Sequence, residues 1–240
     1  MMTGVGHTIG ERRLFAEVNL RVSSGESVAV VGPSGAGKST LLAIAGDLLR
    51  PSTGRVEVCD ERPSDHSLLP VAQQCAWVLQ FAAVFPNRTV ADNVSVPLML
   101  AGVEAGEADE RVSHALRLVE LSEQAEARAR HLSGGELQRL SIARAIAARR
   151  PVVLADEPTS QLDARLSGLA VRSLLASCQD SILVLVTHDR DIARLCNRCY
   201  VLSDSGLTLL RPTHDTALSG LPAADAERQV PGVFEVRRQR

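Results

Sequence analysis

The chain contains almost no lysine. Of its 26 basic residues only one, Lys38, is a lysine, and the others are arginines. Arginine presents a wide planar fork, whereas the ammonium of lysine is a compact charge with three rotatable donors. The near absence of lysine therefore indicates that position 38 needs the compact cation, as a narrow cradle crowded by backbone would require.

Long apolar runs are missing too. No stretch approaches the roughly 18 to 20 apolar residues that cross a bilayer, and the N-terminus lacks the charged segment and apolar core of a signal peptide. We therefore expect a soluble protein that stays in the cytoplasm. The formal net charge is −2, with no large cluster of basic residues, so we expect no nucleic-acid partner.

Cysteines are few and do not suggest a disulfide framework. There are 5, an odd number scattered through a medium-sized chain. Cys196 and Cys199 have C-x-x-C spacing, but no second Cys or His pair lies nearby to complete four metal ligands. We interpret these two residues as reduced thiols rather than as a metal site.

A glycine-rich segment surrounds Lys38. Residues 32–39 fit G-x-x-x-x-G-K-[ST], and they lie between an apolar run and a helical pattern. Glycines at these spacings let successive backbone N–H groups and the N-terminus of the next helix point at phosphates. Lys38 would reach the terminal phosphates, and the Ser39 hydroxyl would bind Mg²⁺. The predicted nucleotide-binding residues are Gly32, Pro33, Ser34, Gly35, Ala36, Gly37, Lys38, Ser39 and Thr40.

The pattern of apolar residues predicts an α/β fold. Valine-rich, nearly continuous runs are typical of strands buried on both faces of a parallel sheet, and they cover 27–31, 151–155 and 182–186. Helical patterns alternate with them and cover 40–48, 136–148 and 163–177. Residues 97–127 carry no valine-rich run, which predicts an inserted helical lobe, and the strand before Gly10 is expected to be short.

Two carboxylates, Asp156 and Glu157, end the apolar run that starts at Val152. Ligands of α/β sheets bind at the carboxyl ends of the strands, so these carboxylates should meet the glycine-rich segment there. We expect Asp156 to hold Mg²⁺ through water. Glu157 lies one residue further on and is the candidate general base for the attacking water.

The segment Leu132-Ser-Gly-Gly-Glu136 lies between these two motifs. Here the chain resembles the ATP-binding cassette family, whose signature is this sequence, over roughly residues 10–210. Ser133 would cap a helix whose first N–H groups are bare because two glycines follow, which creates a second phosphate-binding surface. The resemblance implies that two copies pair head to tail, so that each ATP lies between residues 32–39 of one copy and Ser133, Gly134, Gly135 and Glu136 of the other.

Three further residues match the family one by one. Gln80 falls where the family has a glutamine that touches Mg²⁺ and links the site to the helical lobe. Asp163 matches the aspartate of the loop by which paired domains sense each other, and His188 resembles the histidine that contacts the γ-phosphate. The resemblance thus implies an active ATPase with ATP and Mg²⁺ as cofactors. Its implied catalytic residues are Glu157, His188, Gln80 and Lys38, and its implied metal ligands are Ser39, Gln80 and Asp156.

The chain departs from the family near the nucleotide base. Family members often have an aromatic side chain stacking on adenine near the position of Ile9, but residues 7–10 offer none. Phe15 is predicted to be a core residue instead. The preference for ATP over GTP is therefore left open.

The resemblance also implies the architecture. We expect a P-loop NTPase with a mostly parallel sheet core, an antiparallel β region near the N-terminus and an inserted helical subdomain. Residues 1–210 would form the nucleotide-binding domain, with the helical subdomain at about 81–132. The last thirty residues, 211–240, show no sustained period and are expected to form a loosely ordered tail.

Residues 85–98 occupy the place where family members receive the coupling helix of a membrane subunit. Their ending resembles the branch that contains macrolide-exporter, lipoprotein-releasing and cell-division ATPases. We therefore expect two partners, a second copy of the chain and an integral membrane permease subunit that holds it at the inner face of the membrane. An exporter or mechanotransmission complex, an ABC importer and a regulatory module as in cell division stay open.

Overall fold

A computed structural model describes residues 1–58 and 70–210. The expected tail, 211–240, and Cys59 lie outside the described residues. The elements are β1 (Met2–Ile9), β2 (Arg12–Leu20), β3 (Ser27–Val31), α1 (Lys38–Ala45), β4 (Thr53–Val56), α2 (Val71–Gln74), β5 (Cys75–Val78), α3 (Val90–Leu100), α4 (Ala105–Leu118), η1 (Ser122–Gln124), η2 (Ala129–His131), α5 (Gly134–Ala148), β6 (Val152–Asp156), α6 (Ala164–Ser177), β7 (Ile182–Val186), α7 (Arg190–Ala193), β8 (Arg198–Ser203) and β9 (Gly206–Leu210).

The strands form two sheets. A three-stranded antiparallel sheet has the order β2-β1-β4, and a six-stranded sheet has the order β5-β6-β7-β3-β8-β9. All neighbours in the larger sheet are parallel except β8 and β9. This arrangement confirms the predicted fold class.

The central strand β3 explains why the valine-rich runs do not alternate with polar residues. All of its residues are buried. Val28 and Val30 belong to a core shared with α1 and the antiparallel sheet, whereas Ala29 and Val31 face the core shared with the helices on the other side. Since both faces of the strand are covered, every position is apolar or small.

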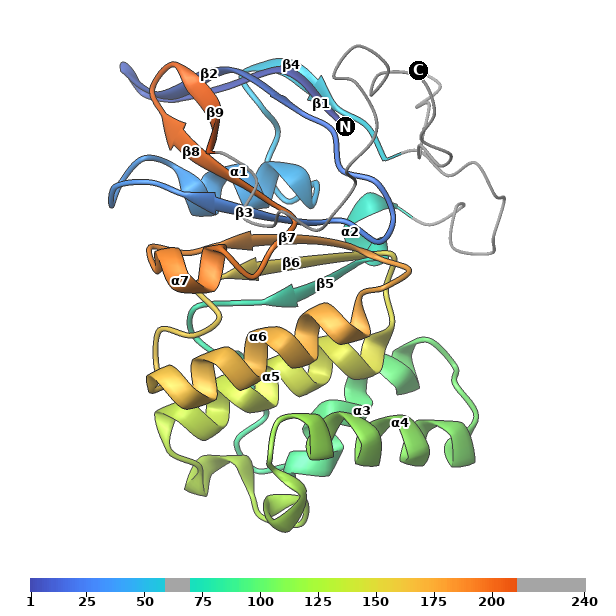
Figure 1. The fold of residues 1–240 in the computed structure, drawn as a ribbon. Helices are drawn as coiled ribbons and strands as arrows, with labels where there is room; N and C mark the ends of the chain where they lie inside the picture. Colours follow the sequence, from blue (N-terminus) through green and yellow to red (C-terminus); the bar gives the residue numbers. More distant parts are fainter. Residues whose placement is uncertain (59–69, 211–240) are drawn as a thin grey trace, which may run out of the picture.

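The layers follow from these two cores (Figure 1). Helix α1 lies between the antiparallel sheet and the six-stranded sheet, while α5 and α6 cover the opposite face of the six-stranded sheet. Helices α3 and α4 pack on α5 and lie furthest from the antiparallel sheet. The carboxyl ends of β3 and β6 are thus left free to form a site.

Three sequence-based boundaries were wrong. Strand β1 is eight residues long rather than short, because it pairs with both β2 and β4. Helix α1 ends at Ala45 rather than at Leu48, since Asp47 adopts a left-handed conformation with φ 58°. Helix α3 begins well before Pro97, because Thr89 and Asp92 form a capping box that starts it at Val90.

The described helices include none that is long and apolar enough to cross a membrane.

Packing around α5 predicts a large stability effect. Leu140 is fully buried between the six-stranded sheet and α3 and α4, whereas Leu100 is 83% exposed. We expect Leu140→Ala to lower the free energy of unfolding by about 3 kcal/mol through lost burial and a cavity. Leu100→Ala should change it by less than about 0.5 kcal/mol. Urea unfolding followed by circular dichroism measures both, and equal effects would contradict the assigned core.

Candidate functional site

A cavity of about 490 Å³ lies at the carboxyl ends of β3 and β6. It brings together the glycine-rich segment, the two carboxylates at the end of β6, the second residue after β5 and the residue after Thr187. The residues that line it are Leu14, Ser34, Gly35, Gly37, Lys38, Ser39, Thr40, Gln80, Asp156, Glu157 and His188. Residues up to 174 positions apart in the sequence therefore share one site.

The glycine-rich segment leaves the N-terminus of α1 without a side-chain cap. Gly37 is the N-cap residue with φ 90°, and a Cβ there would lie 3.0 Å from the Phe15 ring. The uncapped backbone N–H groups of the first turn are therefore available to an anion. The Lys38 ammonium donates to the carbonyls of Gly32 and Pro33 at 3.1 Å and 3.0 Å. The side chain of Lys38 is thus folded back over its own loop, and it also lines the cavity.

Asp156 carries the marks of a metal ligand. Burial raises the pKa of its carboxyl, and the neighbouring charge of Glu157 adds to this, while a hydrogen bond from Ser39 and the Lys38 charge oppose it. Its Oδ1 is buried and has no hydrogen-bond partner among the described residues. The Ser39 hydroxyl and the Gln80 side chain line the same cavity. These hard oxygen donors fit Mg²⁺.

Glu157 is held in a strained position. Its φ is 46°, in the left-handed region that side chains rarely adopt, and such strain concentrates at functional sites. The backbone N–H of Glu157 donates to the Val186 carbonyl at 2.9 Å, which ties it to β7. Its Oε2 lies 2.9 Å from Nδ1 of His188 and accepts the His188 backbone N–H at 3.4 Å. The carboxylate and the imidazole are thus placed as a pair at the mouth of the cavity.

Gln80 connects the cavity with the helices below it. It lines the cavity directly after β5 and Leu79. The carbonyl of Leu79 accepts a hydrogen bond from the side chain of Gln138 at 3.3 Å. Gln138 is buried on α5, so the segment that carries Gln80 is anchored to the helix that starts at the Ser-Gly-Gly segment.

The Ser-Gly-Gly segment lies outside this cavity. Ser133 caps α5 as predicted: its Oγ accepts from the Glu136 N–H at 3.3 Å, and Glu136 accepts from the Ser133 N–H at 2.8 Å. Gly135 lies against the loop before α6, where a Cβ would be 3.0 Å from the Gln161 carbonyl. Asp163 caps α6 and accepts from the Leu166 N–H at 2.9 Å. Neither helix end therefore contributes a residue to the lining of the nucleotide cavity of its own chain.

The structure thus gathers some of the predicted residues and separates others. The predicted residues that do not line the cavity are Gly32, Pro33, Ala36, Ser133, Gly134, Gly135, Glu136 and Asp163. The first three belong to the loop around it. Leu14 is a lining residue that sequence reasoning missed, because it belongs to no motif and reaches the cavity only through the pairing of β1 and β2.

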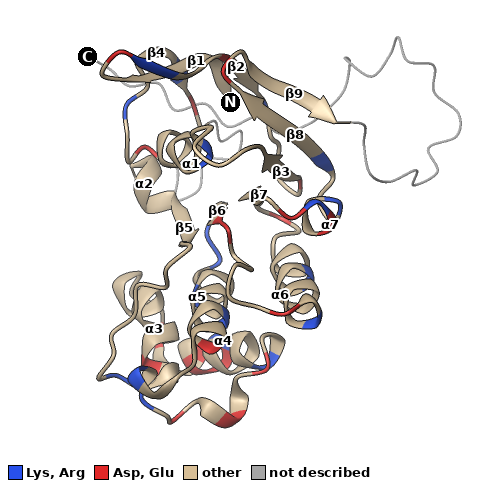
Figure 2. Ribbon diagram, turned by 90° about the vertical axis from the view of Figure 1, so that its left-hand side faces the viewer, with Lys and Arg blue, Asp and Glu red and all other residues tan. Residues whose placement is uncertain are grey.

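A phosphate-binding loop, two carboxylates after a buried strand and a parallel sheet define a P-loop nucleotide triphosphatase. The acidic residues at the end of β6 are coloured red in Figure 2, and they line the same cavity as this loop. A family model described as ABC transporter matches residues 15–160. The chain therefore belongs to the ABC transporter family, and it is an ATP-binding ATPase of that family, as expected.

Similar proteins agree with this assignment. A lipoprotein-releasing system ATP-binding protein, LolD, from Xanthomonas euvesicatoria is 39% identical over 83% of this chain and 84% of its own. A methionine import ATP-binding protein, MetN, from Carboxydothermus hydrogenoformans is 38% identical over 81% of this chain and 60% of its own. The dimeric ATP-binding cassette MJ0796, in a post-hydrolysis state with ADP and Pi, has a TM-score of 0.75 at 31% identity and covers 89% of this chain and 98% of its own.

The cap of α5 predicts a pH effect on stability. The hydroxyl and then the backbone N–H of Ser133 hold the pKa of Glu136 below its ordinary 4.5. A carboxyl whose pKa is depressed on folding stabilises the protein above the unfolded value, and this contribution is lost as pH falls through the folded value. We expect Glu136→Gln to lower the melting temperature slightly at pH 6, with the difference vanishing as pH falls below 4.5.

The control for this measurement is Glu110→Gln, which alters an exposed carboxylate of α4. Differential scanning fluorimetry from pH 3 to pH 6, set around the ordinary glutamate value, compares the two variants with the wild type. A Glu136→Gln difference that grows at low pH would contradict the assigned cap.

Proposed function

We propose that the chain is the ATP-hydrolysing subunit of a transport or mechanotransmission complex and that two copies close head to tail around two ATP·Mg²⁺. The carrying observation is the division of the site. The cavity beside Lys38 contains none of the residues of the Ser-Gly-Gly segment, while Ser133 and Gly134 at the capped N-terminus of α5 are exposed. Each half needs a complement, and a second copy supplies both.

The chemistry of the proposed site follows from the groups in the cavity. On nucleotide binding Lys38 exchanges the Gly32 and Pro33 carbonyls for the terminal phosphates. Ser39, Gln80 and Asp156 would hold Mg²⁺, which would supply positive charge that neutralises the phosphates.

Glu157 acts as the general base on the attacking water, and His188 leaves its contact with Glu157 to reach the γ-phosphate. In the closed pair Ser133 and Gly135 donate to the partner's nucleotide, and Asp163 lies where the two copies meet. When the cleaved phosphate leaves, the contacts that both copies make with it are lost, so the pair reopens.

A trapped dimer tests this function. Glu157→Gln removes the base but keeps the size of the side chain, so we expect hydrolysis to fall at least ~100-fold while ATP still binds. Dimers should then accumulate under saturating ATP and Mg²⁺, as measured by size-exclusion chromatography with light scattering. Lys38→Ala, which loses the phosphate contact, should remain monomeric under the same conditions. A monomeric Glu157→Gln protein that binds ATP would contradict head-to-tail pairing.

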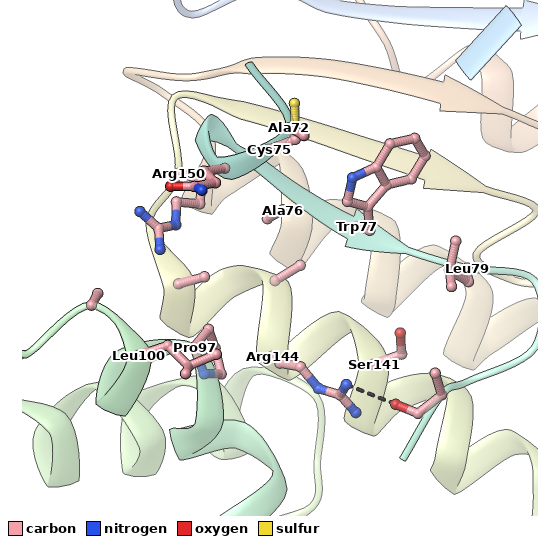
Figure 3. A pocket seen from close by; sticks show the side chains of 15 residues that line it. Ala72, Cys75, Ala76, Trp77, Leu79, Pro97, Leu100, Ser141, Arg144 and Arg150 are labelled. Carbon is pink, nitrogen blue, oxygen red and sulfur yellow. Dashed lines mark hydrogen bonds between the residues drawn. The ribbon is translucent and has the colours of Figure 1, made fainter. Parts of the chain in front are cut away.

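A groove on the helical side of the chain suits a membrane partner (Figure 3). Its volume is about 670 Å³, and it runs between β5, the C-terminal half of α5 and the end of α3. Leu79 and Leu100 lie on its rim and are 40% and 83% exposed. Exposed apolar side chains beside a groove are consistent with a docking surface. It adjoins Gln80, so a segment bound in the groove would be coupled to the nucleotide site.

The charges of the groove indicate the chemistry of its occupant. Arg144 and Arg150 line it, and no acidic residue is among its described lining residues. Arg144 donates to the Ala83 carbonyl at 2.7 Å, burial lowers its pKa, and its Nε and Nη2 have no partner among the described residues. We therefore assign the groove to an amphipathic helix of a membrane subunit that carries an acidic residue.

The relatives bear on which complex this is. The LolD proteins favour an exporter or mechanotransmission complex, and the MetN protein keeps an importer as the second candidate. A regulatory module that signals through a membrane partner is the third.

We propose residues 1–210 as the nucleotide-binding domain, with the helical subdomain at about 81–132. We propose the inner face of the cell membrane as its location.

Recovery of the partner tests the groove. We expect the tagged chain, extracted from native membranes in mild detergent, to bring down an integral membrane subunit, and Arg150→Glu to reduce its yield at least ~10-fold through charge reversal. Arg149→Glu is the matched control, because Arg149 lines a different surface of α5 with Arg111 and His114. Equal losses would contradict docking in the groove.

The identity of the recovered subunit separates the candidates. A large extracytoplasmic domain would support the exporter or mechanotransmission complex, and a separate solute-binding protein in the same complex would favour an importer. Absence of any membrane subunit would contradict the transport function.

A further inference from the structure

The base end of the nucleotide site offers no aromatic ring from the part of the chain that the structure describes. Phe15 is fully buried beneath Gly37, and the Trp77 ring packs under Gly46 in the core. Tyr200 lies on β8 with the Arg198 guanidinium 5.8 Å from its ring centre. Phe81 and Phe85 follow β5, at the opposite edge of the six-stranded sheet from β8 and β9. Among the described residues, a stacking partner for the base must therefore be something other than a Phe, Tyr or Trp side chain.

The β1–β2 hairpin is the part of the molecule that closes over the phosphate loop. The Phe15 ring and the Leu14 Cβ would lie 3.0 Å and 3.2 Å from a Cβ at Gly37, so the hairpin rests directly on that residue. Leu14 also lines the nucleotide cavity. The hairpin is anchored at its far side, where Ala16 donates to the Asp204 carbonyl at 3.1 Å. The hairpin is thus held in place beside the phosphate site by packing and by this hydrogen bond.

Arg12 extends from the β1–β2 hairpin to the outer edge of the phosphate loop, at Gly35. Its Nη2 donates to the Gly35 carbonyl at 3.2 Å, and no other hydrogen bond or ion pair of this side chain occurs within the described residues. Arg12 and Leu14 are two positions apart on β2, so their side chains project from the same face of the strand. Together they form a surface that continues from the cavity to solvent beyond Gly35.

The direction of a bound nucleotide leads over this surface. The triphosphate is fixed by the N-terminus of α1 and by Lys38, and the two carboxylates and His188 occupy the end at which the γ-phosphate reacts. The nucleoside must therefore leave the cavity away from Glu157, and Leu14 is the lining residue that belongs to no motif. The ribose and base then pass from Leu14 toward Arg12.

We propose that the Arg12 guanidinium is the platform on which the nucleotide base stacks. A guanidinium is planar and delocalised, is weakly hydrated, and packs flat on aromatic faces, whereas the ammonium of lysine cannot. The hydrogen bond to Gly35 places the group at the loop edge, where Arg12 is exposed. The inference goes beyond ATP hydrolysis, which fixes the phosphates but not the contact with the base.

This platform has a consequence for specificity. Stacking contacts the π-face that every base possesses, so it holds purines without reading their edges. Ile9 is 58% exposed at the tip of the hairpin and offers no hydrogen-bonding side chain to a base edge. The site should therefore bind GTP nearly as well as ATP, within about threefold, because the two differ only in their edge groups.

The test compares nucleotides with inorganic tripolyphosphate, which has the phosphates but no base. Isothermal titration calorimetry on the full chain with Mg²⁺ should show that Arg12→Ala weakens ATP and GTP binding about 10-fold, while tripolyphosphate binding stays unchanged. Arg12→Tyr should restore ATP affinity because it keeps a planar face, and Arg12→Lys should not. Arg13→Ala, on the opposite face of β2, is the matched control and should bind all three ligands as the wild type does.

Each other outcome overturns the proposal. Equal losses for ATP and tripolyphosphate would make Arg12 a phosphate ligand, and unchanged ATP binding by Arg12→Ala would remove it from the site. Rescue by Arg12→Lys but not by Arg12→Tyr would show that charge alone matters. These results leave the proposed ATPase function standing, whereas a wild-type protein that binds none of the ligands would reject that function. Melting temperatures confirm that the Arg12 and Arg13 variants fold.

Discussion

Every group of the nucleotide site depends on the parallel pairing of β3, β7 and β6. Parallel strands end at the same edge of a sheet, so the loop after β3, the carboxylates at the end of β6 and the histidine after β7 meet there although they are far apart in the sequence. Crossover helices occupy the faces of the sheet and leave this edge open. A one-residue shift in register would exchange the residues that face the two cores, and the packing of each side chain in its own core therefore fixes the register.

The same edge of the sheet gathers buried charge and backbone strain, which lower the stability of the fold. Burial raises the pKa of Asp156, Glu157 adjoins it, and the backbone of Glu157 is strained. Lys38 and Ser39 offset part of this cost, but one oxygen of Asp156 has no partner among the described residues. Strain and unpaired acceptors cost free energy, and such costs are typical of functional sites. In this protein they leave places for a cation and for the phosphates.

The rest of the molecule connects this edge with surfaces that face outward. The β1–β2 hairpin packs on Gly37 and contacts the phosphate loop through Arg12. It is therefore placed to contact the nucleoside. The segment after β5 carries Gln80 to the cavity and Leu79 to the groove, and Gln138 anchors it to α5. The start of α5 is in turn the capped Ser-Gly-Gly segment. Helix α5 therefore links the groove, the nucleotide cavity and the surface proposed for the second copy.

The sequence by itself determined what depends on neighbouring residues. The phosphate loop, the valine-rich strands, the Ser133 cap and the carboxylates after β6 are local, since each needs only the residue types at adjacent positions, and the α/β class and the family followed from them. Only the tertiary structure decided that β1 pairs with both β2 and β4, that Leu14 lines the cavity and that Arg12 reaches Gly35. These features depend on which strands pair and which surfaces pack, and distant residues set that choice through burial rather than through any spacing in the chain.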